Sequence, residues 1–230
     1  MSSKQVVAEG RREVVTPQLP VDDPGAVLPR TAQDILSAAR KLLEEEGYRA
    51  VSYNKVAKLA GVDKGTIAYH FGNKAGLVAA VMDSLIHDEC IAVLQEIRHL
   101  SGSDDRIHRV VDGMRRITIA SDNQRGWFKM LPQVMDEPEL RSLIQRVYAW
   151  YFTINLEWLG IDPEALAHSA EARGLAQVVC ALSDGMAVQL CLGTIEGDDA
   201  WATFETMLRS VLDTPTYGSL RLTRQAVPVE

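Results

Sequence analysis

Residues 52–77 read SYNKVAKLAGVDKGTIAYHFGNKAGL, and the order of polar, small and apolar residues in this stretch decides the fold. Ser52 is a favourable N-cap for a short helix over 53–60, and Asp63 can cap a second helix over 64–70. Gly61 lies between them, where a helix-turn-helix needs a tight bend between helices that cross at about 90–120°. The stretch therefore predicts a helix-turn-helix.

The second of these helices has one apolar and one polar face. Ile67 and Phe71 lie four residues apart and can both point into a core. Thr66, Tyr69 and His70 follow the i, i+3, i+4 spacing that places three side chains on one face. Hydrogen-bonding side chains on the exposed face of a short helix suit the major groove of DNA. This pattern predicts a recognition helix.

Groups that suit phosphate surround the polar face. Lys64 at the start of the second helix and Lys74 just after it provide positive charge for the DNA backbone. The start of the preceding helix offers hydroxyl groups, backbone amides and the helix dipole to a further phosphate. Gly65 lets a backbone or ligand come close. The predicted DNA-binding residues are Ser52, Tyr53, Lys55, Lys64, Gly65, Thr66, Tyr69, His70 and Lys74.

The charge of the chain is unevenly distributed. The net charge is −7, but residues 1–30 carry four basic and four acidic groups and residues 31–76 carry seven basic and five acidic groups. The segment 31–76 is therefore at +2, and the remaining 13 basic and 22 acidic groups give −9. A positive head on an acidic body fits a protein that touches phosphate at one end only.

A longer stretch resembles a known family. Residues 31–77, TAQDILSAARKLLEEEGYRAVSYNKVAKLAGVDKGTIAYHFGNKAGL, are similar to the DNA-binding head of the TetR family of bacterial transcriptional regulators. The matching positions are Thr31, Ile-Leu-x-Ala-Ala at 35–39, Gly-Tyr at 47–48, Ala-Gly-Val at 60–62, Lys-Gly-Thr at 64–66, His-Phe at 70–71, Lys74 and Leu77. The chain departs from many members at Ala68, where they carry an aromatic residue. The resemblance implies a homodimeric repressor that binds operator DNA and releases it on binding a ligand.

The rest of the chain predicts an all-α protein with four segments. Residues 1–30 are proline-rich and predict a flexible arm, 31–76 a three-helix DNA-binding domain, 77–213 a larger helical ligand-binding and dimerisation domain, and 214–230 a tail outside the core. A long helix is expected from Asn73 to Leu100 and would act as a lever between head and bundle. The further helices are expected at 104–121, 124–135, 138–159, 163–193 and 198–213.

The bundle contains candidate residues for a small-molecule site. Aromatic and methionine side chains are frequent at 127–158, and such side chains line many ligand pockets. They suit a bundle core equally well, and their spacing does not separate the two interpretations. The candidate ligand-binding residues are Trp127, Met130, Met135, Tyr148, Tyr151, Trp158 and Gln189, with Gln189 or Tyr151 as a polar anchor. The resemblance indicates no ligand class.

The last two long helices carry apolar residues on more than one face. One face can pack inward while the other meets a second copy of the chain, so the segments 163–193 and 198–213 predict a homodimer. The alternative is that both faces belong to the core of a monomer.

An enzyme and a protein-interaction module are the competing classes. Glu96-x-x-His99 and Asp105-x-x-His108 resemble fragments of helical di-iron sites, but a break at 101–103 separates them and no matching Glu-bearing helices follow. No catalytic or cofactor fingerprint is present, so we expect no enzyme, no metal and no cofactor. The three cysteines lack CxxC spacing, and no secretory signal or apolar run of about 18 residues is found, which predicts a cytoplasmic protein away from membranes.

Overall fold

The computed structural model describes residues 28–98, 100, 103–119 and 121–220, and these residues form helices with no strand among them. Most of the expected arm and the end of the tail lie outside these ranges. The elements are α1 (Arg30–Glu46), the short 3-10 helix η2 (Tyr48–Ala50), α2 (Tyr53–Ala60), α3 (Lys64–Phe71), α4 (Lys74–Ser84), α5 (His87–Ile97), α6 (Ser103–Ile119), α7 (Ser121–Asp136), α8 (Pro138–Trp158), α9 (Ala165–His168), α10 (Ala170–Leu192), α11 (Gly197–Leu212) and α12 (Pro215–Gly218).

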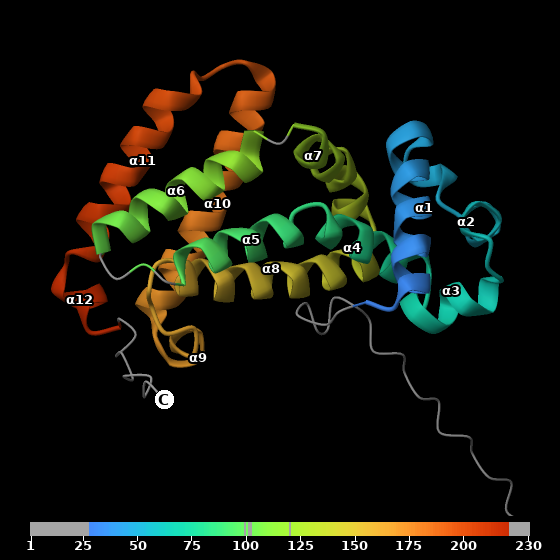
Figure 1. Ribbon diagram of the computed structural model, residues 1–230, viewed down its shortest axis with the longest axis horizontal. Helices are drawn as coiled ribbons and strands as arrows, with labels where there is room; N and C mark the ends of the chain where they lie inside the picture. Colours follow the sequence, from blue (N-terminus) through green and yellow to red (C-terminus); the bar gives the residue numbers. More distant parts are fainter. Residues whose placement is uncertain (1–27, 99, 101–102, 120, 221–230) are drawn as a thin grey trace, which may run out of the picture.

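The head consists of α1, α2 and α3 at one end of the molecule, as Figure 1 shows. The apolar stripe of α1 is buried, including Ile35 and Ala39, and it packs against α2, α3 and α4. Gly47 ends α1 with a φ of 81°, in the left-handed region that glycine adopts without a steric penalty. Gly47 therefore ends the first helix of the head.

The expected single helix from Asn73 to Leu100 is wrong. The chain forms α4 and α5 with an interruption at Leu85–Ile86, where Ile86 has φ −129° and ψ −14°. Neither glycine nor proline marks this point. Leu85 is buried and faces Gly126 of α7, with one methyl group 3.3 Å from where a Cβ at Gly126 would lie. A tertiary contact therefore accompanies the break, and the chain passes from the head into the body through α4 rather than through one long helix.

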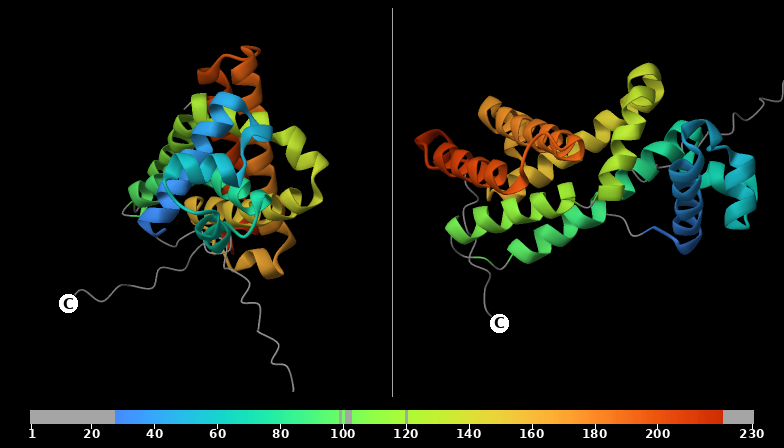
Figure 2. Two further views of the ribbon diagram at one scale, coloured as in Figure 1. Left: turned by 90° about the vertical axis from the view of Figure 1, so that its right-hand side faces the viewer. Right: turned by 90° about the horizontal axis from the view of Figure 1, so that it is seen from above.

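The body is organised around α8. This helix packs against α4, α5, α7 and α10 and runs from the head side of the molecule toward α9 (Figure 1). The right-hand view in Figure 2 shows the head projecting from one end of the body while α10 and α11 lie toward the other. α8 therefore extends from the head side of the body into the centre of the bundle.

Two expectations for the C-terminal part need correction. The segment expected as one helix over 163–193 divides into α9 and α10, because Ser169 has an extended backbone and its Oγ accepts a hydrogen bond from the amide of Ala172 at 3.1 Å. The beginning of the tail was expected outside the core, yet Tyr217 and Leu220 pack against it. The amide of Asp162 also donates to the carbonyl oxygen of Leu220 at 3.1 Å.

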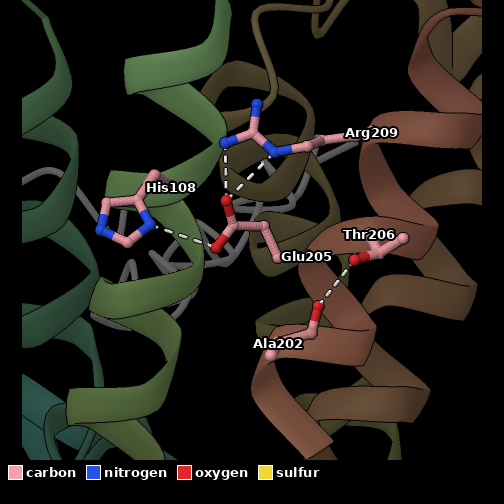
Figure 3. A network of polar contacts seen from close by, with 5 residues as sticks. All are labelled: His108, Ala202, Glu205, Thr206 and Arg209. Carbon is pink, nitrogen blue, oxygen red and sulfur yellow. Dashed lines mark hydrogen bonds and ion pairs between the residues drawn. The ribbon is translucent and has the colours of Figure 1, made fainter. Parts of the chain in front are cut away.

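Polar contacts hold α11 against α6. Figure 3 shows Glu205 of α11 between two partners, Arg209 on its own helix and His108 on α6. Arg209 Nη2 lies 2.6 Å from one carboxylate oxygen of Glu205 and His108 Nδ1 lies 3.1 Å from the other. Burial works to raise the pKa of Glu205, but the hydrogen bonds from Arg209 and His108 outweigh it and lower that pKa. The network adds a polar contact between α11 and α6 to the packing of the buried apolar side chains of α11, such as Phe204.

Candidate functional site

The bend between α2 and α3 has the geometry that the sequence predicts. Ser52 Oγ accepts a hydrogen bond from the amide of Lys55 at 3.4 Å, which caps α2. Gly61 follows the helix in the left-handed conformation, with φ 68° and ψ 29°. The amide of Val62 then donates to the carbonyl of Ala57 at 3.1 Å. The two helices are thereby joined by a tight turn, as a helix-turn-helix requires.

The start of α3 is held by a double hydrogen bond to Asp63. Its Oδ1 accepts from the amide of Thr66 at 2.9 Å, and its Oδ2 accepts from the Thr66 hydroxyl at 2.8 Å. These two bonds lower the pKa of Asp63. A Cβ added at Gly65 would lie 2.9 Å from Asp63 Oδ1, so Gly65 leaves room for the cap itself. The hydroxyl proton of Thr66 is used within the protein, which leaves its oxygen only as an acceptor.

α3 separates an apolar and an exposed face as expected. Ile67 and Phe71 are fully buried, at 0% exposure each. Tyr69 is 74% exposed, and the half-buried His70 meets its ring edge-on with centroids 5.0 Å apart. A large aromatic side chain with a polar tip therefore stands out from a helix whose opposite side is anchored in the core. Such a face can enter a DNA groove without rearrangement of the head.

Two of the residues expected at phosphates do not present a free polar group at the surface: Lys55 is in a surface ion pair and the Tyr53 hydroxyl is buried. Lys55 Nζ lies 2.5 Å from Glu46 Oε2. The Tyr53 hydroxyl is buried and has no hydrogen-bond partner among the described residues, and burial raises its pKa to about 12. Lys64 is exposed at the first position of α3. Of the two lysines, Lys64 is the one whose ammonium group forms no ion pair with a described residue.

A polar junction connects the head with the start of α8. The Tyr48 hydroxyl donates to Glu137, and Asn73 Nδ2 donates to Glu139 Oε1 at 2.6 Å. Lys74 Nζ lies 3.9 Å from the centre of the Tyr48 ring, within the range of a cation–π contact. Lys74, which was expected at a phosphate, therefore belongs to this head–body junction in the structure.

The body contains a cavity between α5, α6, α7, α8 and α10. About 580 Å³ of space lies between its walls, its opening included. Four of the seven candidate ligand-binding residues line it, namely Trp127, Tyr148, Tyr151 and Trp158. The further lining residues are Ile86, Cys90, Met114, Ile117, Thr118, Ile154, Asn155, Cys180, Ser183 and Asp184.

Three candidate ligand-binding residues are not among those that line this cavity. Met130 is buried in the core, whereas Met135 is exposed at the end of α7. Gln189 lies on the exposed side of α10, where its side chain and its carbonyl accept hydrogen bonds from Thr194. Which side of α7 and α10 faces the cavity decides the positions of these residues. The frequency of aromatic and methionine residues in the sequence does not predict that side.

An acidic side chain in the cavity wall, and a second one bonded to a residue of that wall, were not predicted. Asp184 of α10 lines it and accepts a hydrogen bond from the Tyr148 hydroxyl at 2.7 Å. Asp83, at 8% exposure, accepts one from the Tyr151 hydroxyl at 3.4 Å. Burial raises the pKa of both carboxyl groups, that of Asp83 to about 6. An acidic residue within an otherwise apolar helix, as in the run ALSDGMAV at 181–188, is the signal that could have identified Asp184.

The fragments that resemble a metal site have other partners. Glu96 pairs with Arg116 at 2.7 Å, and His108 pairs with Glu205. Among the residues that the structure describes, no group of three His, Cys, Asp or Glu side chains could hold a metal ion. Glu96 and His108 thus take part in polar contacts of the helix surfaces.

Comparisons with known proteins agree on one class. Residues 35–81 match the model for "Bacterial regulatory proteins, tetR family". The chain is 29% identical over 179 residues to the HTH-type transcriptional regulator BetI 2 of Chromohalobacter salexigens, covering 75% of this chain and 82% of that one. It is 32% identical over 163 residues to the HTH-type transcriptional regulator BetI of Burkholderia mallei, covering 68% of this chain and 79% of that one.

A solved structure shares the fold. A Rhodococcus sp. protein assigned to the TetR family superposes with a TM-score of 0.62 at 22% identity, covering 80% of this chain and all of that one. The common architecture therefore includes both the head and the helical body.

Proposed function

The chain belongs to the TetR family of transcriptional regulators, and from that premise we propose that it is a repressor that reads operator DNA with the exposed face of α3. One observation carries the assignment of the face. Tyr69 stands out at 74% exposure from a short capped helix whose Ile67 and Phe71 are fully buried. The cavity beneath α8 is then the site of a small-molecule effector that releases the DNA.

Lys64 provides the test of the DNA-binding surface. Its ammonium group is exposed on the same short helix as Tyr69. A variant that neutralises one phosphate fewer reduces the slope of log affinity against log salt concentration by about 0.9. We expect Lys64→Ala to weaken binding to all DNA sequences and to flatten this plot, measured by titrating labelled upstream DNA at several salt concentrations. Lys129→Ala, which removes an exposed lysine of α7, should leave both unchanged. An unaltered slope in Lys64→Ala would remove Lys64 from the residues that bind phosphate.

A second copy of the chain is the proposed partner of α10 and α11. α10 is long and apolar enough to cross a membrane by length and composition, with a mean hydropathy of 1.6 over its most apolar window, yet only 22% of that window is buried. Its exposed apolar residues include Val178, Leu182 and Leu192. Covering them in a homodimer would place two α3 helices on one DNA duplex, where half-sites are about 34–36 Å apart.

The link between cavity and head runs through α8. Its first residues contact the head through Glu137 and Glu139, and its later residues Tyr148, Tyr151 and Trp158 line the cavity. The protein would have two conformers that differ in the positions of α8 and α3. A ligand that binds one conformer more tightly would shift the equilibrium between them by the difference between its two binding free energies. This proposal replaces the lever expected from Asn73 to Leu100, which the break at Leu85–Ile86 divides.

The junction is expected to contribute measurably to stability. Tyr48→Phe removes a half-buried hydrogen bond to a carboxylate, so we expect the free energy of unfolding to fall by about 1–2 kcal/mol. Urea unfolding of Tyr48→Phe, Glu137→Gln and the double variant gives the coupling between the two side chains. Tyr69→Phe, which removes an exposed hydroxyl, is the matched control. A coupling near zero would show that Tyr48 and Glu137 do not hold head and body together.

An enzyme is not the favoured class. The relatives are named as transcriptional regulators, and Glu96 and His108 have polar partners on the helix surfaces, Arg116 and Glu205. A regulator of this kind acts where the bacterial chromosome lies, so the proposed location is the cytoplasm. A pure protein-interaction module would leave the exposed face of α3 without a partner.

A further inference from the structure

An exposed acidic residue, Asp63, lies at the start of the helix that is proposed to read DNA. Figure 1 shows this helix, α3, at the outer end of the molecule, and the segment 31–76 to which it belongs has a net charge of +2. The Asp63 carboxylate stabilises the helix start as its N-cap, but a negative charge repels DNA phosphate. The first turn of α3 is therefore better suited to base edges, which the N-terminal residues of a recognition helix contact.

The hydrogen bond between Asp63 and Thr66 has a fixed direction. Thr66 Oγ1 lies 2.8 Å from Asp63 Oδ2, and the Thr66 amide donates to Asp63 Oδ1 at 2.9 Å. These bonds lower the pKa of Asp63, so its carboxylate is ionised at neutral pH and can only accept hydrogen bonds. The Thr66 hydroxyl must therefore donate its one proton to Asp63, and the hydroxyl oxygen retains only lone pairs for a partner outside the protein.

An oxygen that only accepts hydrogen bonds excludes several partners on DNA. Thr66 is half-buried and lies three residues before the exposed Tyr69, on the same side of α3. Its oxygen cannot form a hydrogen bond with a phosphate, because phosphate oxygens carry no proton. In the major groove, adenine N6 and cytosine N4 present donors, whereas guanine O6 and thymine O4 present acceptors. The lone pairs of Thr66 therefore distinguish amino bases from keto bases.

From this geometry we infer that Thr66 reads an adenine or a cytosine in each half-site of the operator, and that Asp63 is a positioning residue that sets this preference by binding the hydroxyl proton. The inference rests on the proposed function, because it identifies the class of base that α3 recognises. Gly65 is consistent with it, since a Cβ at this position would lie 2.9 Å from Asp63 Oδ1. A larger residue would displace the carboxylate that holds the proton of Thr66.

The operator position that Thr66 reads is found by comparing two selections. The full-length protein and its Thr66→Val variant are each allowed to bind a pool of duplexes with a randomised central segment, and the retained sequences are determined. Valine has nearly the shape of threonine without the hydroxyl, so we expect one position in each half-site to lose its preference. In the unchanged protein that position should favour adenine or cytosine over guanine or thymine by about threefold to tenfold, as one neutral hydrogen bond allows.

Asp63→Asn reverses the direction of the hydrogen bond without removing the cap. Asparagine is as favourable an N-cap as aspartate, and its Oδ1 can still accept from the Thr66 amide. Its Nδ2 then donates to Thr66 Oγ1, which frees the hydroxyl proton for an oxygen of a base. We expect the preference at the same position to change to guanine or thymine. A purely structural role of Asp63 would change the affinity for all sequences and leave the order of the bases as it was.

Two controls separate this effect from charge and from loss of the cap. Thr66→Ser retains the hydroxyl and should retain the preference for adenine or cytosine. Asp63→Asn combined with Thr66→Val lacks the freed hydroxyl proton and should show no preference at that position. Removal of the negative charge should strengthen binding of both Asp63→Asn proteins to all sequences, and a salt titration measures this effect separately.

A change in the DNA decides even if Asp63→Asn does not fold. The selected base is replaced by its analogue without the amino group, purine for adenine or pyrimidinone for cytosine. The affinity of the unchanged protein should fall by about threefold to tenfold, because its Thr66 oxygen loses a donor. The affinity of Thr66→Val, which has no hydroxyl oxygen, should not change.

The outcomes are separable from those of the proposed function. A guanine or thymine at the position read by Thr66 in the unchanged protein would overturn the inference, as would an order of bases that Thr66→Val or Asp63→Asn leaves unaltered. In each of these cases the protein still selects a DNA sequence, so the proposed function stands. A protein that enriches no sequence from the pool loses the proposed function, and the inference that rests on it is overturned as well.

Discussion

Leu182→Glu is expected to convert the dimer into monomers and to weaken operator binding by about 10²–10⁴-fold, the advantage that linking two binding modules gives over one. Leu182 is 38% exposed in the single chain and lies between Val178 and Leu192 on the exposed apolar side of α10. A second chain would bury this side chain, and a carboxylate in its place would be buried without a partner. Each head would remain intact but would meet the DNA alone.

Light scattering after size exclusion gives the oligomeric state, and titration of labelled DNA gives the affinity. Met135→Glu is the matched control, because Met135 is an equally apolar and more exposed side chain, at 68%, that lies on α7 outside the proposed interface. The control should remain a dimer with unchanged affinity. A Leu182→Glu protein that stays dimeric, or a monomer that binds as tightly as the unchanged protein, would contradict the proposed interface.

The position of α11 matters for the same interface. α11 contributes the exposed Met207 beside α10, and the contacts of Glu205 with Arg209 and His108 hold the helix against α6 (Figure 3). α6 in turn provides Met114 and Thr118 to the wall of the cavity. α6 thus connects the wall of the cavity with α11 of the proposed interface, which gives an effector a second route by which it can alter the distance between the two heads.

The local features of the head could be predicted from the sequence because short-range rules determine them. Ser52 and Asp63 are the N-caps of α2 and α3, as the sequence predicts. Gly47 and Gly61 have the positive φ that a helix end and a tight bend require. The break between α4 and α5 could not be predicted in this way. Leu85 and Ile86 have ordinary helical preferences, and the interruption accompanies a contact with α7 that is distant in sequence.

In the candidate site, too, the features set by local sequence could be predicted and those set by helix packing could not. The exposure of Tyr69 and the burial of Ile67 follow from helical periodicity alone. The pairing of Lys55 with Glu46 and the position of Lys74 over Tyr48 depend on how α1, α2 and α4 approach one another. Asp184 illustrates the same limit in the bundle, because a single acid in a helix indicates a surface group until packing shows that it faces a cavity.

Two substitutions on opposite sides of α3 are expected to separate stability from DNA binding. Phe71→Ala removes a fully buried ring and should lower the free energy of unfolding of the head by about 3–5 kcal/mol. Tyr69→Ala removes an exposed ring and should change that free energy by no more than about 0.5 kcal/mol. Its cost should appear in DNA binding instead, at about 1–3 kcal/mol for each half-site if the side chain contacts a base.

Urea unfolding and DNA titration of both proteins measure the two effects, with Phe71→Leu as the variant that retains most of the buried volume and therefore both properties. A folded Tyr69→Ala protein with undiminished affinity and specificity would show that α3 does not read DNA through this face. Loss of stability in Tyr69→Ala would show that its ring supports the head. Because the two residues lie two positions apart on one helix, opposite outcomes can arise only if the core anchors one face of α3 and DNA is read by the other.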